Sequence, residues 1–80
     1  MMTHAEIKSI CSTPVQRMNG ETLGEMILWF NQTPLEDIKN LFADNKTALA
    51  ELERIVSFLC EIPADFNKLE ALRHHIENAI

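Results

Sequence analysis

Residues 46–80 read KTALAELERIVSFLCEIPADFNKLEALRHHIENAI, and the spacing of apolar residues in this stretch predicts two long helices. In the first half, apolar residues recur at steps of three and four, the repeat of one helix face: Leu49, Leu52, Val56 and Leu59. In the second half, a similar stripe contains Phe66, Leu69, Leu72, Ile76 and Ile80. Pro63 separates the halves, because proline clashes with the preceding helical turn. We therefore predict helices over about 46–61 and 64–79 that pack as an antiparallel hairpin.

Upstream of this hairpin, the starts of shorter helices are marked by capping boxes. In this pattern a Ser or Thr side chain accepts a backbone N–H of the first turn, and a Glu or Gln three residues later bonds back. The pattern occurs from Thr3 to Glu6, Thr13 to Gln16, Thr22 to Glu25 and Thr33 to Glu36. Pro34 strengthens the last start, since proline is favoured at the first helical position. The dipeptide Asn19-Gly20 is expected to end the brief helix that begins near Thr13.

The predicted fold class is all-α, a compact bundle of about five helices. Three short N-terminal to central helices pack on the C-terminal hairpin, and no segment has the alternating pattern of a strand. The chain has 80 residues, of which 46% are hydrophobic and 24% charged, within the range of globular proteins. A chain of this length can enclose one core, so we predict a single helical domain over 1–80.

The charge balance argues against nucleic acids and membranes as partners. Lys and Arg number 7 against 12 Asp and Glu, and the net charge of −5 repels nucleic-acid backbones and anionic lipid surfaces. Two cysteines, Cys11 and Cys60, are too few for the disulfide framework of a small secreted protein, so both are expected to be buried, reduced thiols. The first residues lack the pattern of a signal peptide, and we expect a cytoplasmic protein.

The sequence contains no catalytic or metal-binding signature. His74 and His75 are adjacent, so they point about 100° apart on a helix and cannot ligate one metal as a pair four residues apart would. Carboxylate pairs such as Glu51 and Glu53 are typical of solvated helix faces. Arg73 occupies a core register position and is expected to pair with a carboxylate of Glu53, Glu70 or Glu77. We expect no enzymatic activity, no cofactor and no metal.

Some bulky side chains do not fit the expected core faces and are candidates for contact with a partner. Residues 26–30, MILWF, are all apolar, and Leu28 and Trp29 project away from the face formed by their neighbours. Either this helix is buried on several sides, or these side chains form a contact surface. Phe58 poses the same alternative on its helix. The acidic pair Glu36 and Asp37 completes the predicted set of partner contacts.

The function predicted by elimination is a small protein–protein interaction module, an adaptor or inhibitor that covers a surface of another protein or protein complex. A sharper hypothesis is an antagonist encoded by a phage or other mobile element, which competes for the basic groove of a nucleic-acid-binding complex. One alternative is a structural subunit that forms a homodimer through the stripe Leu49, Leu52, Val56 and Leu59 or through the Trp29 face. Another is a helix-turn-helix DNA-binding regulator, which Glu36 and Asp37 disfavour because they lie where phosphate would bind.

Overall fold

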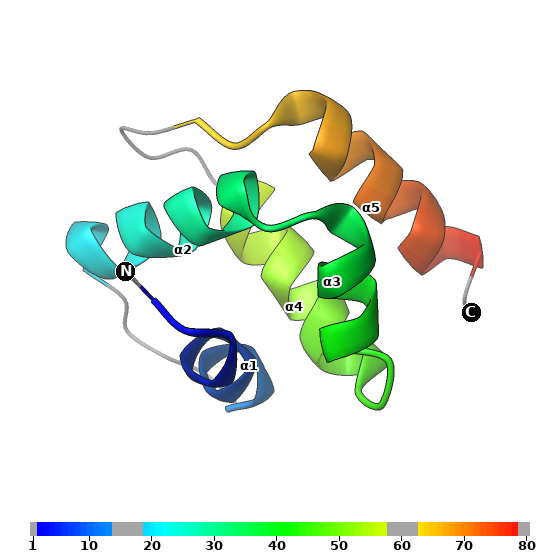
Figure 1. The fold of residues 1–80 in the computed structure, drawn as a ribbon, viewed down its shortest axis with the longest axis horizontal. Coiled ribbons are helices and arrows are strands. Elements are labelled where there is room, and N and C mark those ends of the chain that lie inside the picture. Colours follow the sequence, from blue (N-terminus) through cyan, green and yellow to red (C-terminus); the bar gives the residue numbers. More distant parts are fainter. Residues whose placement is uncertain (1, 14–18, 58–62, 79–80) are drawn as a thin grey trace.

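The central element of the computed structural model is α4 (Lys46–Ser57), which packs against three other helices. These are α1 (His4–Ser12), α2 (Gly20–Gln32) and α5 (Phe66–Asn78), and a shorter helix, α3 (Leu35–Leu41), lies between α2 and α4 in the chain (Figure 1). The structure describes residues 2–13, 19–57 and 63–78. Within these ranges it contains five helices and no strand, which confirms the predicted all-α bundle.

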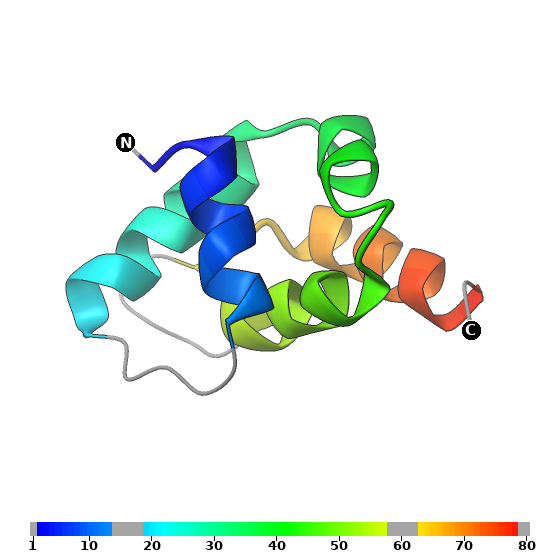
Figure 2. The ribbon, with the colours of Figure 1, turned by 90° about the horizontal axis from the view of Figure 1, so that it is seen from below.

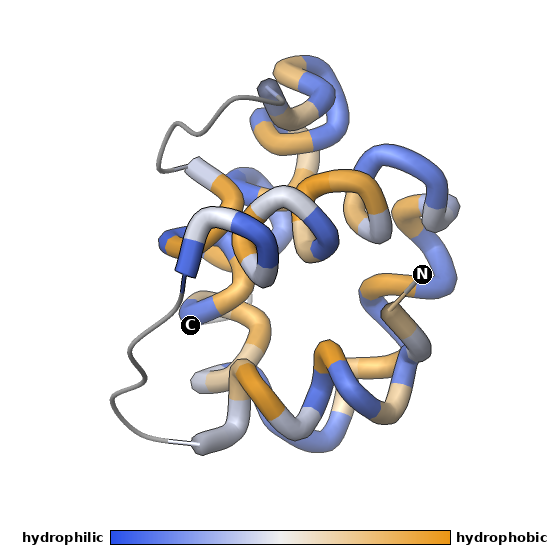
Figure 3. Tube along the Cα trace, turned by 90° about the vertical axis from the view of Figure 1, so that its left-hand side faces the viewer, coloured by the Kyte–Doolittle hydropathy of each residue, from blue (hydrophilic) through white to orange (hydrophobic). Residues whose placement is uncertain are grey.

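The core lies where the inner faces of these helices meet. α4 contributes the largest share, and the predicted stripe residues Leu49, Leu52 and Val56 are all buried. The side chains buried most completely come from all five helices and from the turn after α3: Ile7, Met26, Ile27, Phe30, Ile38, Phe42, Leu52 and Leu72. Apolar and polar segments alternate along each helix accordingly (Figure 3). Because Leu49, Leu52 and Val56 are covered within the protein, they do not offer the homodimer surface considered above; Leu59, the fourth residue of that stripe, lies outside the described residues.

The predicted C-terminal hairpin is present. α4 and α5 run in opposite directions, as both ribbon views show (Figures 1 and 2), and Leu69 and Leu72 are buried in their contact region. Arg73 ties the two helices together: its Nε donates to Glu53 Oε1 at 2.5 Å and its Nη1 to Glu70 Oε1 at 2.9 Å, as predicted. The last helix was predicted over 64–79, and α5 begins two residues later, at Phe66. The preceding helix was predicted over 46–61, and its residues 58–61 lie outside the described residues.

Phe66 differs from its prediction. It was assigned to the core stripe of the last helix, but its side chain is 68% exposed. Steps of three residues, from Phe66 to Leu69 and on to Leu72, turn by about 300° each and so drift around the helix. Phe66 therefore lies about 90° from the centre of the buried face, at the very start of α5.

The helix caps confirm one predicted helix start and show that two other predicted starts were wrong. Thr3 and Glu6 form the predicted capping box, in which the Glu6 N–H donates to Thr3 Oγ1 and the Thr3 N–H to Glu6 Oε1, both at 3.2 Å. α2 begins at Gly20 rather than near Thr22, because Asn19 Oδ1 accepts the Thr22 N–H at 2.8 Å. Asn19-Gly20 thus opens a helix and was wrongly predicted to close one. The brief helix predicted after Thr13 lies largely in 14–18, outside the described residues.

The predicted capping box at Thr33 does not form. The Thr33 hydroxyl instead donates backward to the Trp29 carbonyl at 2.6 Å, and its backbone N–H donates to the same oxygen at 3.0 Å. Thr33 therefore ends α2, and Pro34 precedes α3 without any side-chain cap. α4 and α5 are capped by Asn45 and Asp65, whose side chains accept the N–H groups of Ala48 and Lys68.

Candidate interaction surface at the junction of α2 and α5

A polar junction joins the end of α2 to the start of α5. The Asn31 side chain donates from Nδ2 to the Pro63 carbonyl at 3.1 Å and accepts the Asp65 N–H on Oδ1 at 2.7 Å. One amide group thus satisfies both a carbonyl and an N–H of the segment that leads into α5. Asp65 in turn caps α5 through its side chain, so the start of that helix is positioned directly by α2.

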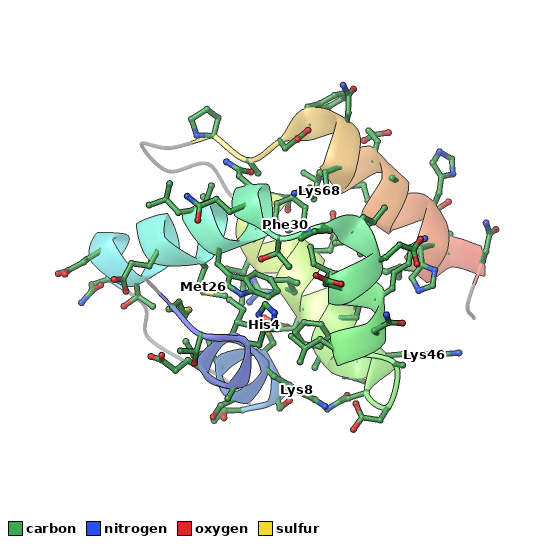
Figure 4. All side chains as sticks on the ribbon, viewed as in Figure 1. His4, Lys8, Met26, Phe30, Lys46 and Lys68 are labelled. Atoms are coloured by element: carbon green, nitrogen blue, oxygen red, sulfur yellow. The ribbon has the colours of Figure 1, made fainter. Side chains whose placement is uncertain are left out.

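Lys68 reinforces the same junction from α5. Its ammonium group donates to three backbone carbonyls, of Phe30 at 2.8 Å, Asn31 at 2.9 Å and Thr33 at 2.8 Å (Figure 4). It also lies 5.5 Å from the centre of the Phe30 ring. The last carbonyls of a helix lack intrahelical partners and carry partial negative charge, so a cation is stabilising there. Burial lowers the pKa of Lys68, an effect that the nearby Asp65 carboxylate opposes.

Two large apolar side chains remain exposed beside this junction. Leu28 on α2 is 40% exposed and Phe66 on α5 is 68% exposed, and no other large hydrophobic residue in the described part of the chain is classed as exposed. Leu28 lies one helical turn before Asn31, and Phe66 directly follows Asp65, to which Asn31 is hydrogen-bonded. Exposed large apolar side chains are candidates for contact with a partner.

Acidic groups accompany Leu28 along the outer face of α2. Glu21, Glu25, Leu28 and Gln32 are spaced by four, three and four residues, so they share one stripe, and all four are exposed. Within the described ranges neither glutamate has an ion-pair or hydrogen-bond partner, whereas five other carboxylates pair with a Lys or Arg, those of Glu36, Asp44, Glu51, Glu53 and Glu70. α2 itself contains no Lys or Arg.

The prediction that Trp29 contacts a partner is wrong. Its side chain is only 2% exposed, so it cannot form the contact surface that was one of its two interpretations. α1 covers it: the indole Nε1–H donates to His4 Nδ1 at 3.0 Å, and the two rings meet edge to face with centroids 5.5 Å apart. Trp29 is therefore a core residue that joins α2 to α1.

The other predicted contact residues have different outcomes. Leu28 is exposed as the contact hypothesis required, while Phe58 lies outside the described residues. Glu36 and Asp37 are exposed in the first turn of α3, where Glu36 lies 3.6 Å from Lys39. No hydrogen bond or ion pair in the described ranges joins either acid to the Leu28 stripe, so the structure does not assemble the predicted set into one site.

Sequence reasoning missed Phe66 as a surface residue and Asn31 and Lys68 as the residues that hold the junction together. A signal for the start of α5 was available, since Asp65 is a favoured helix cap and places Phe66 at the first helical position. Asn31 and Lys68 had no local signal. Their partners lie more than 30 residues away in the chain.

Cys11 is a buried free thiol, as predicted, while Cys60 lies outside the described residues. Burial, together with repulsion from Glu51, raises the pKa of Cys11 from 9.0 to about 12. Thiolate is the reactive form of cysteine, so this site has the character of a structural thiol.

We expect Cys11 to make stability fall at alkaline pH. The folded protein keeps the thiol proton more tightly than the unfolded chain, so this contribution is complete below pH 9.0 and is lost between 9.0 and about 12. One thiol can supply a slope of at most about 1.4 kcal/mol per pH unit. Urea unfolding across this range should show a shallower decline for Cys11→Ala than for wild type; equal declines would contradict the assignment.

The described part of the chain contains neither a cluster suited to a metal ion nor a membrane-spanning helix. No group of three or more His, Cys, Asp and Glu residues in the described ranges is arranged to hold a metal ion. Over the same residues, no helix has the length and apolar character needed to cross a bilayer.

Comparison of the chain with protein-family models, with curated proteins and with solved structures finds no match.

Proposed function

We propose that this chain is a small, non-enzymatic protein-binding module whose contact surface is the junction of α2 and α5. The observation that carries the proposal is the pair of exposed apolar residues, Leu28 and Phe66, beside the Asn31–Asp65 hydrogen bond. Burial of such side chains against a partner releases water from apolar surface and provides favourable free energy.

The junction makes this surface suitable for binding because its geometry is already set before a partner arrives. Asn31 and Lys68 hold the end of α2 and the start of α5 through five hydrogen bonds. A preorganised surface loses less conformational entropy on association than a mobile one. The proposal covers both an adaptor and an inhibitor, such as a phage-encoded antagonist, since either acts by occupying a surface of its target.

The test is a comparison of surface variants in capture from a host-cell extract. The immobilised wild-type protein should retain a defined set of proteins, and the double variant Leu28→Asp, Phe66→Asp should retain at least about tenfold less of them. A tenfold loss corresponds to about 1.4 kcal/mol, within the range for two exposed anchors. Mass spectrometry of the retained proteins provides the measurement.

The control is Ala50→Asp, which adds one of the two negative charges of the double variant at an exposed position on α4. It should retain the wild-type set, and circular dichroism should show all variants equally helical. Retention of the same proteins by the double variant, or equal loss in the Ala50→Asp control, would contradict the proposed surface.

A further inference from the structure

We infer that the segment of the partner which covers this surface is a cationic amphipathic helix. The inference rests on the proposed function and specifies the chemistry of the partner. It follows from three features: the line of exposed residues along α2, the two glutamates within it that have no ion-pair partner among the described residues, and the exposed apolar side chains of Leu28 and Phe66.

The shape of the exposed stripe favours a helix as the occupant. Glu21, Glu25, Leu28 and Gln32 follow the axis of α2 over about three turns, or roughly 16 Å at 1.5 Å per residue. A partner helix that packs alongside α2 presents its own side chains at the same steps of three and four. Phe66, which follows Asp65 at the start of α5, provides a second exposed apolar side chain next to the residue bonded to Asn31.

The charges favour a basic sequence in that helix. Glu21 and Glu25 have no Lys or Arg partner in the part of the chain that the structure describes, and a partner that brought only apolar groups would desolvate them without compensation. Lys or Arg residues beside the apolar anchor would pair with both carboxylates. Complementary charges also speed association and discriminate against other partners.

A second copy of this chain fits the surface less well. Each copy carries a net charge of −5, so two copies repel each other. The Lys and the Arg of α5 are also engaged already: Lys68 binds three carbonyls, and Arg73 binds Glu53 and Glu70. Neither is available to neutralise Glu21 or Glu25 of another copy.

The experiment selects a random displayed peptide library against the folded, full-length protein. Peptides enriched on the wild type should combine Lys or Arg with a bulky apolar residue at helical spacing. Selection on the charge-reversed variant Glu21→Lys, Glu25→Lys should enrich acidic peptides instead. The matched control Glu36→Lys, Asp37→Lys places the same reversal on α3 and should keep the preference for basic peptides.

An enriched peptide, synthesised and titrated against the protein, provides the quantitative test. Its affinity should fall with rising salt, and Glu21→Gln, Glu25→Gln should weaken it roughly fivefold at low salt, as expected for two exposed ion pairs. Failure to enrich any peptide, or enrichment of neutral or acidic peptides that still depend on Leu28 and Phe66, would overturn the inference; in the second case the proposed surface would stand. Basic peptides whose binding survives the uncharged double substitution Leu28→Ser, Phe66→Ser would overturn both.

Discussion

Substitution of Trp29 by alanine is expected to leave the protein largely unfolded at room temperature. The indole is 2% exposed, and its loss would open a cavity between α1 and α2 that the surrounding side chains can fill only in part. Truncation of a buried aromatic residue costs about 3–5 kcal/mol. A core of this size provides only about 3–5 kcal/mol of net stability, so the substitution would remove nearly all of the free energy of unfolding. Thermal and urea unfolding followed by circular dichroism would measure the loss.

Two milder variants separate packing from hydrogen bonding at this site. Trp29→Phe keeps most of the apolar burial but removes the Nε1–H that donates to His4, and His4→Ala removes the acceptor instead. Each should cost about 1–2 kcal/mol, because a net hydrogen bond is worth about 1 kcal/mol and an unsatisfied buried donor somewhat more. Full stability in Trp29→Ala would contradict the buried assignment and return Trp29 to the surface.

Lys68→Met is expected to lower the free energy of unfolding by about 2–3 kcal/mol. Methionine keeps the length and apolar stem of the side chain but removes all three hydrogen bonds to the carbonyls of Phe30, Asn31 and Thr33. Hydrogen bonds from a charged donor are worth about 1.5–3 kcal/mol each where no water replaces them, and water can reach part of this half-buried site. Urea unfolding measures the change.

Lys39→Met is the control for this experiment. Lys39 on α3 has a similar side chain, and its ion pair with Glu36 is a solvent-accessible contact at 3.6 Å. A surface ion pair of this kind contributes less than about 1 kcal/mol. If Lys39→Met and Lys68→Met lost stability equally, the capping role of Lys68 would be wrong.

These two sites also bear on the proposed function. Lys68 and Asn31 hold the junction, and Trp29 holds α2 against α1, so the exposed stripe of α2 is fixed from both sides. Residues that set the position of a binding surface need not touch the partner. Variants of Lys68 should therefore weaken binding only as far as they loosen the junction, whereas variants of Leu28 and Phe66 act on the contact itself.

The predicted helix starts show what local capping patterns in the sequence can determine. The capping box at Thr3 forms because, among the described residues, no other group competes for the side chains of Thr3 and Glu6. At Thr33, by contrast, the hydroxyl donates to the nearby carbonyl of Trp29 and no capping box forms. Asn19 and Thr22 were both eligible caps for α2, and Asn19 starts the helix earlier. Local chemistry thus indicated that helices begin near these residues but not which eligible group would serve.

Sequence alone determined the all-α class, the antiparallel pairing of the last two helices, the buried stripe of α4 and the three carboxylates among which Arg73 finds its two partners. These features depend on periodicity, proline and spacing within a helix or its neighbour, which are local properties of the chain. Only the tertiary structure decided that Trp29 is covered while Leu28 and Phe66 are not, and that Asn31 meets Asp65, 34 residues away. The reason is that burial depends on which helix comes to lie opposite a given face, and the spacing of residues along one helix does not contain that information.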